Sequence, residues 1–80
     1  MTLIEYKKSV FEDLRRIGIP GAKKIISHLE TLNDPHKGVP LKGECEGLFR
    51  LRIGDYKVIY TKTGKGVLIL RIEYKGKVYT

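Results

Sequence analysis

Cysteine and histidine are scarce in this sequence of 80 residues. The single cysteine, Cys45, cannot form a disulfide bond within the chain, and it has no second cysteine beside it to make a metal site. The two histidines, His28 and His36, have no neighbours that would complete a metal site or a catalytic pair. We therefore expect no metal, no cofactor and no nuclease chemistry built on paired histidines.

Long apolar runs are absent as well. No segment approaches the roughly 18 apolar residues that a transmembrane helix needs. The N-terminal stretch "MTLIEYKKS" also lacks the extended apolar region of a signal peptide. We therefore expect a cytoplasmic protein with no membrane partner. A chain of 80 residues is too short to divide, so we expect one domain over residues 1–80.

Acidic residues are few compared with basic ones. The chain has 9 Asp and Glu against 16 Lys and Arg, which gives a net charge of +7 and a pI near 9.7. Such an excess of positive charge favours an anionic partner: a nucleic acid, an acidic protein or, as the weakest option, a membrane surface. The hydrophobic fraction of 41% is that of a globular protein, so these charges should lie on a folded surface.

The first half of the chain carries a strand pattern followed by two helix patterns. "TLIEY" is typical of a short strand. A helix should follow from Ser9, which would cap it while Glu12 reaches back in a capping box, and Gly18 should end it. A second helix should start near Pro20 and stop at 33–35. The apolar faces of the two helices would comprise Val10, Phe11, Leu14 and Ile17, and then Ala22, Ile25, Ile26, Leu29 and Leu32.

The second half is typical of a loop followed by strands. The Gly- and Pro-rich segment 36–47 should be the loop. Strands are predicted over 48–53, 56–62 and 67–74, with a further short one at 77–79. The predicted fold class is therefore α+β: an N-terminal strand, two antiparallel helices, and an antiparallel sheet of three to four strands.

A two-residue turn at Gly54-Asp55 would join the first two of these later strands and fix their register. The pairs would be Ile53 with Tyr56, Arg52 with Lys57, Leu51 with Val58, and Phe49 with Tyr60. Because side chains alternate between the faces of a sheet, the apolar members of these pairs should cover the helices, with both tyrosines structural. Arg50, Arg52 and Lys57 should share the opposite face with Ile59.

Three cations on one hairpin need a physical reason, because like charges opposed across two strands repel. Exposed sheet faces are often polar, and arginine stems cover apolar surface well, so a solvated face is one explanation. However, no hairpin position on that face is Asp or Glu. The missing acidic partner favours an anion-binding site formed by Arg50, Arg52 and Lys57.

The strand over 67–74 has two apolar sets, and the sequence leaves open which one is buried. One set is Leu68, Leu70 and Ile72, and the alternate set includes Val67 and Ile69. A loop of odd length or a bulge would direct the first set into the core and Arg71 onto the cationic face. A loop of even length would do the opposite.

The segment "LKGECEGLFRLRIGDYKVIY", preceded by two helices and "LNDP" and followed by "ILRIEYKGKVY", resembles the RelE/ParE toxin superfamily of toxin–antitoxin systems. The resemblance implies a small α+β fold whose antiparallel sheet backs onto two helices. RelE-like members are ribonucleases that cut messenger RNA in the ribosomal A site. A cognate antitoxin, here expected to be RelB-like, silences them.

The resemblance also implies site residues. Basic residues on the central strands form the active site in RelE-like members, and by position these are Arg50, Arg52 and Lys57. We assign Arg52 and Lys57 to the scissile phosphate and Arg50 to an adjacent phosphate, with Lys57 a candidate general base as well. Superfamily members tend to end in a His-Arg-x-x-Val-Tyr-like segment, where this chain has Tyr74 and Lys75 in place of His and Arg. The remaining predicted residues are Lys75 and Tyr79 for catalysis, and Arg71, Lys75 and Lys77 for RNA binding.

Two other functions fit the same resemblance. A ParE-like toxin would inhibit DNA gyrase without cutting RNA, and it would not need cations at all of positions 50, 52 and 57. A catalytically degenerate member would bind only the antitoxin or nucleic acid. The departures at Tyr74 and Lys75 motivate this second alternative.

Overall fold

The computed structural model describes residues 3–31, 38–43 and 46–74. Within them the order of elements is β1 (Leu3–Tyr6), α1 (Val10–Ile17), α2 (Ile19–Glu30), β2 (Val39–Pro40), β3 (Leu48–Ile53), β4 (Tyr56–Lys62) and β5 (Gly66–Tyr74). The predicted α+β class, with a strand, two helices and then antiparallel strands, is confirmed. The predicted strand at 77–79 and the predicted apolar position Leu32 lie outside the described residues.

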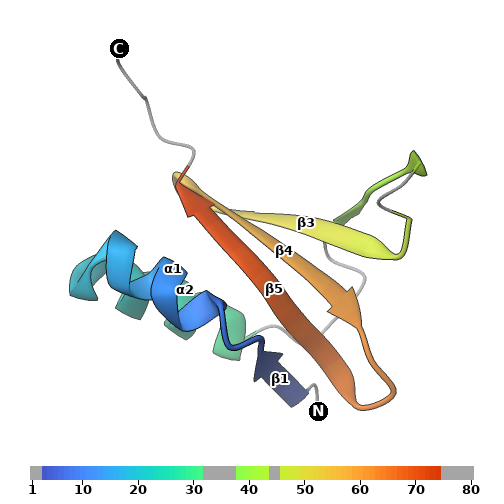
Figure 1. Cartoon of the computed structure of the whole chain (residues 1–80), viewed down its shortest axis with the longest axis horizontal. Coiled ribbons are helices and arrows are strands. Elements are labelled where there is room, and N and C mark those ends of the chain that lie inside the picture. Colours follow the sequence, from blue (N-terminus) through green and yellow to red (C-terminus); the bar gives the residue numbers. More distant parts are fainter. Residues whose placement is uncertain (1–2, 32–37, 44–45, 75–80) are drawn as a thin grey trace.

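The described strands form one mixed sheet in the order β1-β5-β4-β3-β2. β3, β4 and β5 pair antiparallel, as predicted, whereas β1 pairs parallel with β5 (Figure 1). A Cβ atom at Gly66 would collide with the backbone of Leu3, so the glycine lets β1 approach β5 closely. β2 arises inside the predicted loop, where it pairs Val39 with Arg50 and Pro40 with Phe49.

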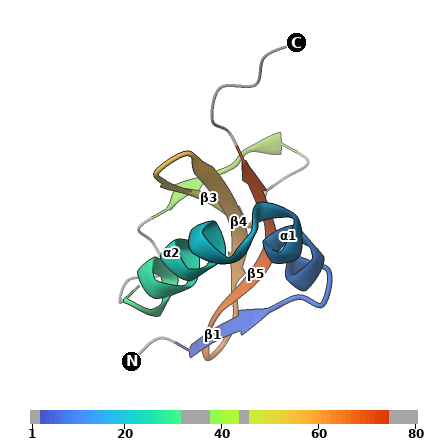
Figure 2. The ribbon, with the colours of Figure 1, turned by 90° about the vertical axis from the view of Figure 1, so that its left-hand side faces the viewer.

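Both helices pack on one face of the sheet and leave the other face uncovered by described residues (Figure 2). Val10 of α1 and two α2 residues, Ile25 and Leu29, are fully buried against the strands. The strands contribute the rest of the core, which comprises Leu51, Ile53, Val58, Tyr60, Val67, Ile69 and Ile72. Neither helix is long and apolar enough to cross a membrane.

The β3–β4 hairpin has the predicted register at every predicted pair, including Arg52 opposite Lys57 and Leu51 opposite Val58. Gly54 takes the first position of the two-residue turn with φ +58°, a backbone conformation that favours glycine. A pairing that starts from this turn leaves Leu51 and Val58 on the buried face. The cations at neighbouring positions therefore point away from the helices.

β5 contains a bulge at Leu70, which settles the question that its two apolar sets left open. Tyr60 pairs with Ile69, but the preceding residue of β4, Ile59, pairs with Arg71, so Leu70 has no partner on β4. Before the bulge Val67 and Ile69 are buried, and after it Ile72 is. The bulge therefore lies within the strand rather than in the loop, and each apolar set supplies only part of the core.

The N-terminus of α1 differs from the predicted capping box. Ser9 already has helical φ and ψ angles, and its side chain makes no capping hydrogen bond. The N–H groups of Val10 and Phe11 instead donate to the backbone carbonyls of Lys7 and Lys8. Phe11 also lies off the buried face, with 56% of its surface exposed, because a residue adjacent to the buried Val10 is rotated about 100° around the helix.

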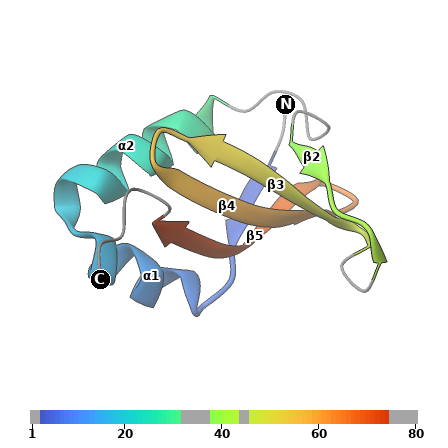
Figure 3. The ribbon, with the colours of Figure 1, turned by 90° about the horizontal axis from the view of Figure 1, so that it is seen from above.

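α2 begins at Ile19 with Pro20 in its first turn, as predicted, but its last helical residue is Glu30 rather than a residue near 33. Ile25 and Leu29, four residues apart, are the buried pair. Ile26 is 37% exposed, so the predicted stripe is wider than the buried one. A narrow stripe suffices because this helix contacts the sheet along one side only (Figure 3).

Asp13 of α1 protects the edge of β5 that β1 does not cover. β1 pairs only with Gly66–Ile69, so the later residues of β5 have no strand beside them on that side among the described residues. The backbone N–H of Ile72 donates to the Asp13 carboxylate at 3.1 Å. A side chain that occupies the edge in this way blocks pairing with another chain and fixes α1 against the strand just after the bulge.

We expect Leu51→Ala to lower the free energy of unfolding by about 2–4 kcal/mol, because it removes buried methyl groups opposite Val58. Lys65→Ala, at an exposed loop position, should change it by less than about 0.5 kcal/mol. Urea denaturation of both variants checks this. Equal midpoints would contradict the assignment of the buried face.

Asp13→Ala should lower the free energy of unfolding by about 1–3 kcal/mol, since it leaves the partly buried N–H of Ile72 without its acceptor. Asp13→Asn keeps an oxygen acceptor and should lose less. Glu12→Ala is the matched control, because Glu12 is an exposed carboxylate in the same turn of α1. If Asp13→Ala and Glu12→Ala were equally stable in urea, the edge contact would contribute nothing to folding.

Candidate functional site

The outer face of the sheet, which points away from the helices, gathers side chains from four strands. Cross-strand pairing aligns them in two rows. One row runs Val39, Arg50, Ile59, Arg71, and the next runs Arg52, Lys57, Glu73. We call Arg50, Arg52, Lys57 and Arg71 the basic face. The three hairpin cations therefore lie together as predicted, and the bulge at Leu70 adds Arg71 to them.

The basic face includes an acidic partner that the hairpin pattern did not reveal. Glu73 Oε1 lies 3.3 Å from Lys57 Nζ, and Glu73 Oε2 lies 3.6 Å from Arg71 Nη2. The absence of acids therefore holds for the hairpin but not for the sheet, because the acid comes from β5. Sequence reasoning missed it because only the bulge directs Glu73 outward, and a bulge leaves no clear mark in the residue pattern.

The members of the basic face differ in how firmly they are held. Lys57 and Glu73 are half-buried, with side chains 25% and 30% exposed, whereas the Arg71 side chain is 64% exposed. Arg52 is exposed, and its Nε donates to the backbone carbonyl of Gly54 at 3.4 Å, which ties it to the hairpin turn. Arg50 lies between two apolar neighbours, Val39 and Ile59. The face thus combines one anchored ion pair with arginines accessible to a ligand.

Two hollows lie on either side of the Lys57–Glu73 ion pair. One has a volume of about 560 Å³ and is lined by Val39, Arg50, Arg52, Tyr56 and Lys57. The other, of about 510 Å³, lies between α1 and the end of β5, where Arg71, Glu73 and Tyr74 meet Asp13, Arg16, Ile17, Tyr56 and Ile72. The first is rich in cations and the second is mixed in charge. A phosphate group fits the first by charge, and the ion pair stands at its boundary with the second.

Lys57 is best suited to a cationic role in this arrangement. Its Nζ atom lies 3.3 Å from the Glu73 carboxylate, in an ion pair. An ammonium group can donate to a phosphate oxygen and stabilise negative charge, but it cannot accept a proton. The two predicted roles of Lys57, on the scissile phosphate and as a general base, stay predictions.

The other predicted site residues lie elsewhere. Lys75, Lys77 and Tyr79 are outside the described residues. Tyr74 is half-exposed at the end of β5, with its ring 5.4 Å from the ring of Tyr56. His28 is exposed on α2, and no cluster of metal-ligating side chains occurs within 3–31, 38–43 and 46–74.

Tyr60 is buried and serves the site indirectly. Its hydroxyl accepts a hydrogen bond from the backbone N–H of Gly38 at 3.0 Å. A Cβ atom at position 38 would lie 2.6 Å from that hydroxyl, so glycine is needed for the approach. This contact holds the chain next to β2 and thereby places Val39 beside Arg50.

A protein-family model, the ParE toxin of type II toxin–antitoxin systems (parDE), matches residues 4–79. The match extends over nearly the whole sequence. The chain belongs to this family. The resemblance to the RelE/ParE toxin superfamily that the sequence indicated is thus confirmed, and the basic face is the outer sheet surface of a type II toxin. Among curated proteins, none matches the chain significantly.

Solved structures of related toxins share the fold of this toxin. The toxin–antitoxin complex RelBE2 from Mycobacterium tuberculosis contains a chain with a TM-score of 0.87 and 21% identity, covering 95% of this toxin and 93% of that chain. The archaeal RelE–RelB complex from Pyrococcus horikoshii OT3 contains a chain with a TM-score of 0.71 and 26% identity. The match covers 96% of this toxin and 98% of that chain. The YoeB–YefM complex from Staphylococcus aureus contains a chain with a TM-score of 0.69 and 23% identity. The match covers 92% of this toxin and 97% of that chain.

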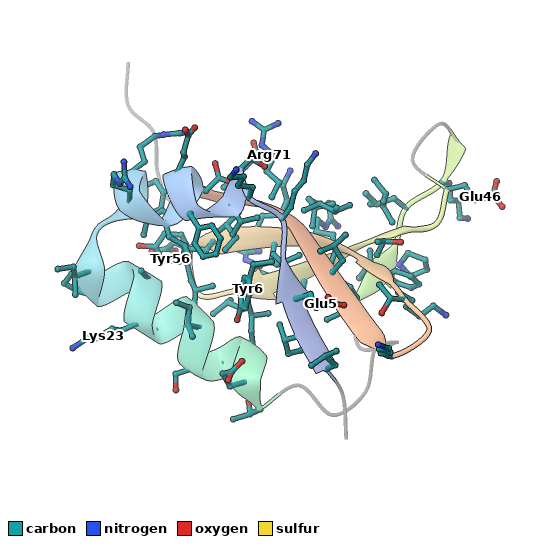
Figure 4. The ribbon with its side chains drawn as sticks, turned by 60° about the horizontal axis from the view of Figure 1, so that its bottom comes forward. Glu5, Tyr6, Lys23, Glu46, Tyr56 and Arg71 are labelled. Carbon is teal, nitrogen blue, oxygen red and sulfur yellow. The ribbon has the colours of Figure 1, made fainter. Side chains whose placement is uncertain are left out.

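We expect Arg52→Ala to weaken binding of single-stranded RNA by this toxin and to flatten its salt dependence. The slope of log K against log salt should fall in magnitude by about 0.7, the value for one phosphate contact on a single strand. Lys23→Ala is the matched control, because Lys23 is exposed on α2 and points away from the sheet (Figure 4). Equal salt slopes for Arg52→Ala and Lys23→Ala would show that RNA binding depends on the overall positive charge of the toxin rather than on the basic face.

Proposed function

We propose that this toxin is an endoribonuclease that cleaves messenger RNA in the ribosomal A site and thereby inhibits translation. The observation that carries the proposal is the basic face: four cations and one carboxylate converge on the sheet surface that the helices leave open. Gyrase inhibition does not by itself call for such a concentration of phosphate-binding groups. RNA cleavage does, because charge accumulates on the phosphate during the reaction.

Cations alone can supply much of the catalysis. The 2′-hydroxyl attacks the adjacent phosphorus in line with the departing 5′-oxygen, and negative charge builds on the phosphate oxygens. Arg52 and Lys57, paired across β3 and β4, would hold those oxygens, and Arg50 would hold a neighbouring phosphate. Preorganised guanidinium and ammonium groups stabilise such a transition state strongly. The ribosome would supply the orientation of the RNA strand.

A cognate antitoxin, RelB-like in character, would keep this toxin inactive. The support is twofold. The solved relatives from M. tuberculosis, P. horikoshii and S. aureus were each determined as a complex of toxin and antitoxin. A chain of net charge +7 with an open cationic surface also complements an acidic segment, which can cover it without much structure of its own.

Inhibition of DNA gyrase is the second candidate, and one observation favours it. The matching family model is that of the ParE toxin, and a ParE-like toxin inhibits gyrase in the superfamily that the sequence resembles. In that case the basic face would contribute to binding a protein–DNA target and no RNA bond would be broken. A non-catalytic member would do neither.

Arg52→Ala should reduce the single-turnover rate of A-site cleavage at saturating ribosomes by about a hundredfold or more. One transition-state charge contact corresponds to roughly 3–4 kcal/mol. Arg52→Lys should recover part of the rate, since it restores charge but not the planar, bidentate donor group. Lys23→Ala, remote from the face, should cut at the wild-type rate once bound.

Three outcomes separate the candidate functions. If Arg52→Ala cuts as fast as wild type once bound, the basic face only docks RNA and the catalytic assignment is wrong. If the wild-type protein leaves messenger RNA intact but stops gyrase supercoiling, the ParE-like function is right. If it does neither and still binds its antitoxin or RNA, the toxin is a non-catalytic member.

A further inference from the structure

The proposed cleavage needs a group that removes the proton from the 2′-hydroxyl, and the predicted cations cannot do this while they are charged. We propose that Glu73 is that general base and that Lys57, its ion-pair partner, is the general acid. This inference deepens the proposed function and rests on it. The observation that carries it is the half-buried Lys57–Glu73 pair at the boundary of the two hollows.

Glu73 stands out because of its place in the sheet. It is the only acidic residue in the three antiparallel strands β3, β4 and β5. Its two oxygens are held separately, one by Lys57 at 3.3 Å and the other by Arg71 at 3.6 Å. Each carboxylate oxygen can accept more than one hydrogen bond, so both keep capacity for a further donor. Two cations, one at each oxygen, thus orient the carboxylate without using up its ability to accept a proton.

The two hollows leave space for a nucleotide on both sides of this pair. Arg50, Arg52 and Lys57 line the hollow that suits a phosphate, and Glu73 lines the neighbouring one. A phosphate that contacts Arg52 and Lys57 therefore has its adjoining ribose within reach of Glu73. A general base acts on a proton within hydrogen-bond distance, so the mechanism requires the 2′-hydroxyl to enter the hollow at Glu73 while the 5′-oxygen faces Lys57.

The reaction balances with these two residues. The 2′-hydroxyl gives its proton to Glu73, the 2′-oxygen bonds to phosphorus, and the bond from phosphorus to the 5′-oxygen breaks. The departing 5′-oxygen takes a proton from the Lys57 ammonium. The products are a 2′,3′-cyclic phosphate and a 5′-hydroxyl end. Transfer of the proton from Glu73 to the neutral Lys57, across the 3.3 Å between them, restores the starting state.

A structural role for Glu73 makes the opposite prediction. If the carboxylate only relieves repulsion among the cations, its removal should free Lys57 and Arg71 for phosphate and should raise RNA affinity without lowering the rate. The groups around Glu73 that bear on its charge are Lys57 on β4, Arg71 on β5, and Asp13 and Arg16 on α1, which line the same hollow. None of these but Lys57 has a part in the proposed proton transfers.

The test is single-turnover cleavage of A-site messenger RNA on purified ribosomes by wild type, Glu73→Gln and Glu5→Gln. Glu5, an exposed carboxylate on β1, is the matched control; it pairs with Leu68, which precedes the bulge, whereas Arg71 and Glu73 follow it (Figure 4). We expect a loss of about 10²–10⁴-fold for Glu73→Gln, the usual contribution of a positioned general base, and none for Glu5→Gln. The wild-type rate should fall as the pH drops into the range that protonates carboxylates, and that fall should disappear in Glu73→Gln. Urea denaturation would show whether both variants fold.

A substrate with sulfur in place of the bridging 5′-oxygen separates the two roles. A thiolate leaves without needing a proton, so Lys57→Ala should lose less rate on this substrate than on the oxygen substrate, keeping only the loss of its phosphate contact, while the loss in Glu73→Gln stays the same on both. If Glu73→Gln is folded and cuts as fast as wild type with the same pH profile, the inference is overturned and the proposed function stands. If the rate loss in Lys57→Ala is as large with sulfur as with oxygen, Lys57 is not the acid. If wild type cuts nothing, both the function and this mechanism fail.

Discussion

The β-bulge at Leu70 is the constraint on which the arrangement of this toxin's outer surface depends. Without the bulge, the side chains of β5 would alternate between the two faces of the sheet from one end of the strand to the other. Because Val67 and Ile69 face the helices, Arg71 and Glu73 would then face them too, and Ile72 would face solvent. Two charged side chains in the core would have to lose their hydration, at a large cost to the stability of a small domain. One unpaired residue on β5 therefore reconciles a continuous apolar core with a charged outer face.

The two faces of the sheet have opposite energetic characters. On the inner face Tyr60, Val58 and the helix residues Ile25 and Leu29 are fully buried, and this packing supplies most of the stability. On the outer face Arg52 opposes Lys57, which destabilises the hairpin by a smaller amount. The carboxylate of Glu73 offsets part of that repulsion. An uncovered face that carries such a cost is typical of a binding or catalytic surface rather than a structural one.

The comparisons locate the fold more firmly than the activity. Solved toxins with 21–26% identity share this architecture along nearly the whole chain, so the sheet and its helices tolerate extensive substitution. Function in such a fold depends on the side chains at the site. In this toxin Val39, Ile59 and Glu73 accompany the cations, and of these Glu73 alone can exchange a proton. Its contact with Lys57 is therefore the feature on which the proposed mechanism depends.

The sequence by itself determined the elements whose signals are local. Apolar periodicity set the two helices, Gly18 set their junction, and the Gly54 turn set the hairpin register, so Arg50, Arg52 and Lys57 could be placed on one face without a structure. Each of these features depends on residues close together in the chain. The resemblance in "FRLRIGDYKVIY" supplied the superfamily for the same reason, since the segment is contiguous.

Only the tertiary structure decided the features that depend on distant contacts. β2 has two residues, too few for any periodic pattern, and it forms beside β3 where the Gly38 backbone bonds to Tyr60. The parallel pairing of β1 with β5 joins residues more than 60 apart in sequence. The contact between Asp13 and Ile72 joins residues 59 apart. The bulge, and with it the meeting of Glu73 with Lys57, follows from fitting β5 to β4 and the helices at once. A pattern along one strand cannot encode that fit, because the free energy that selects it comes from the elements packed against the strand.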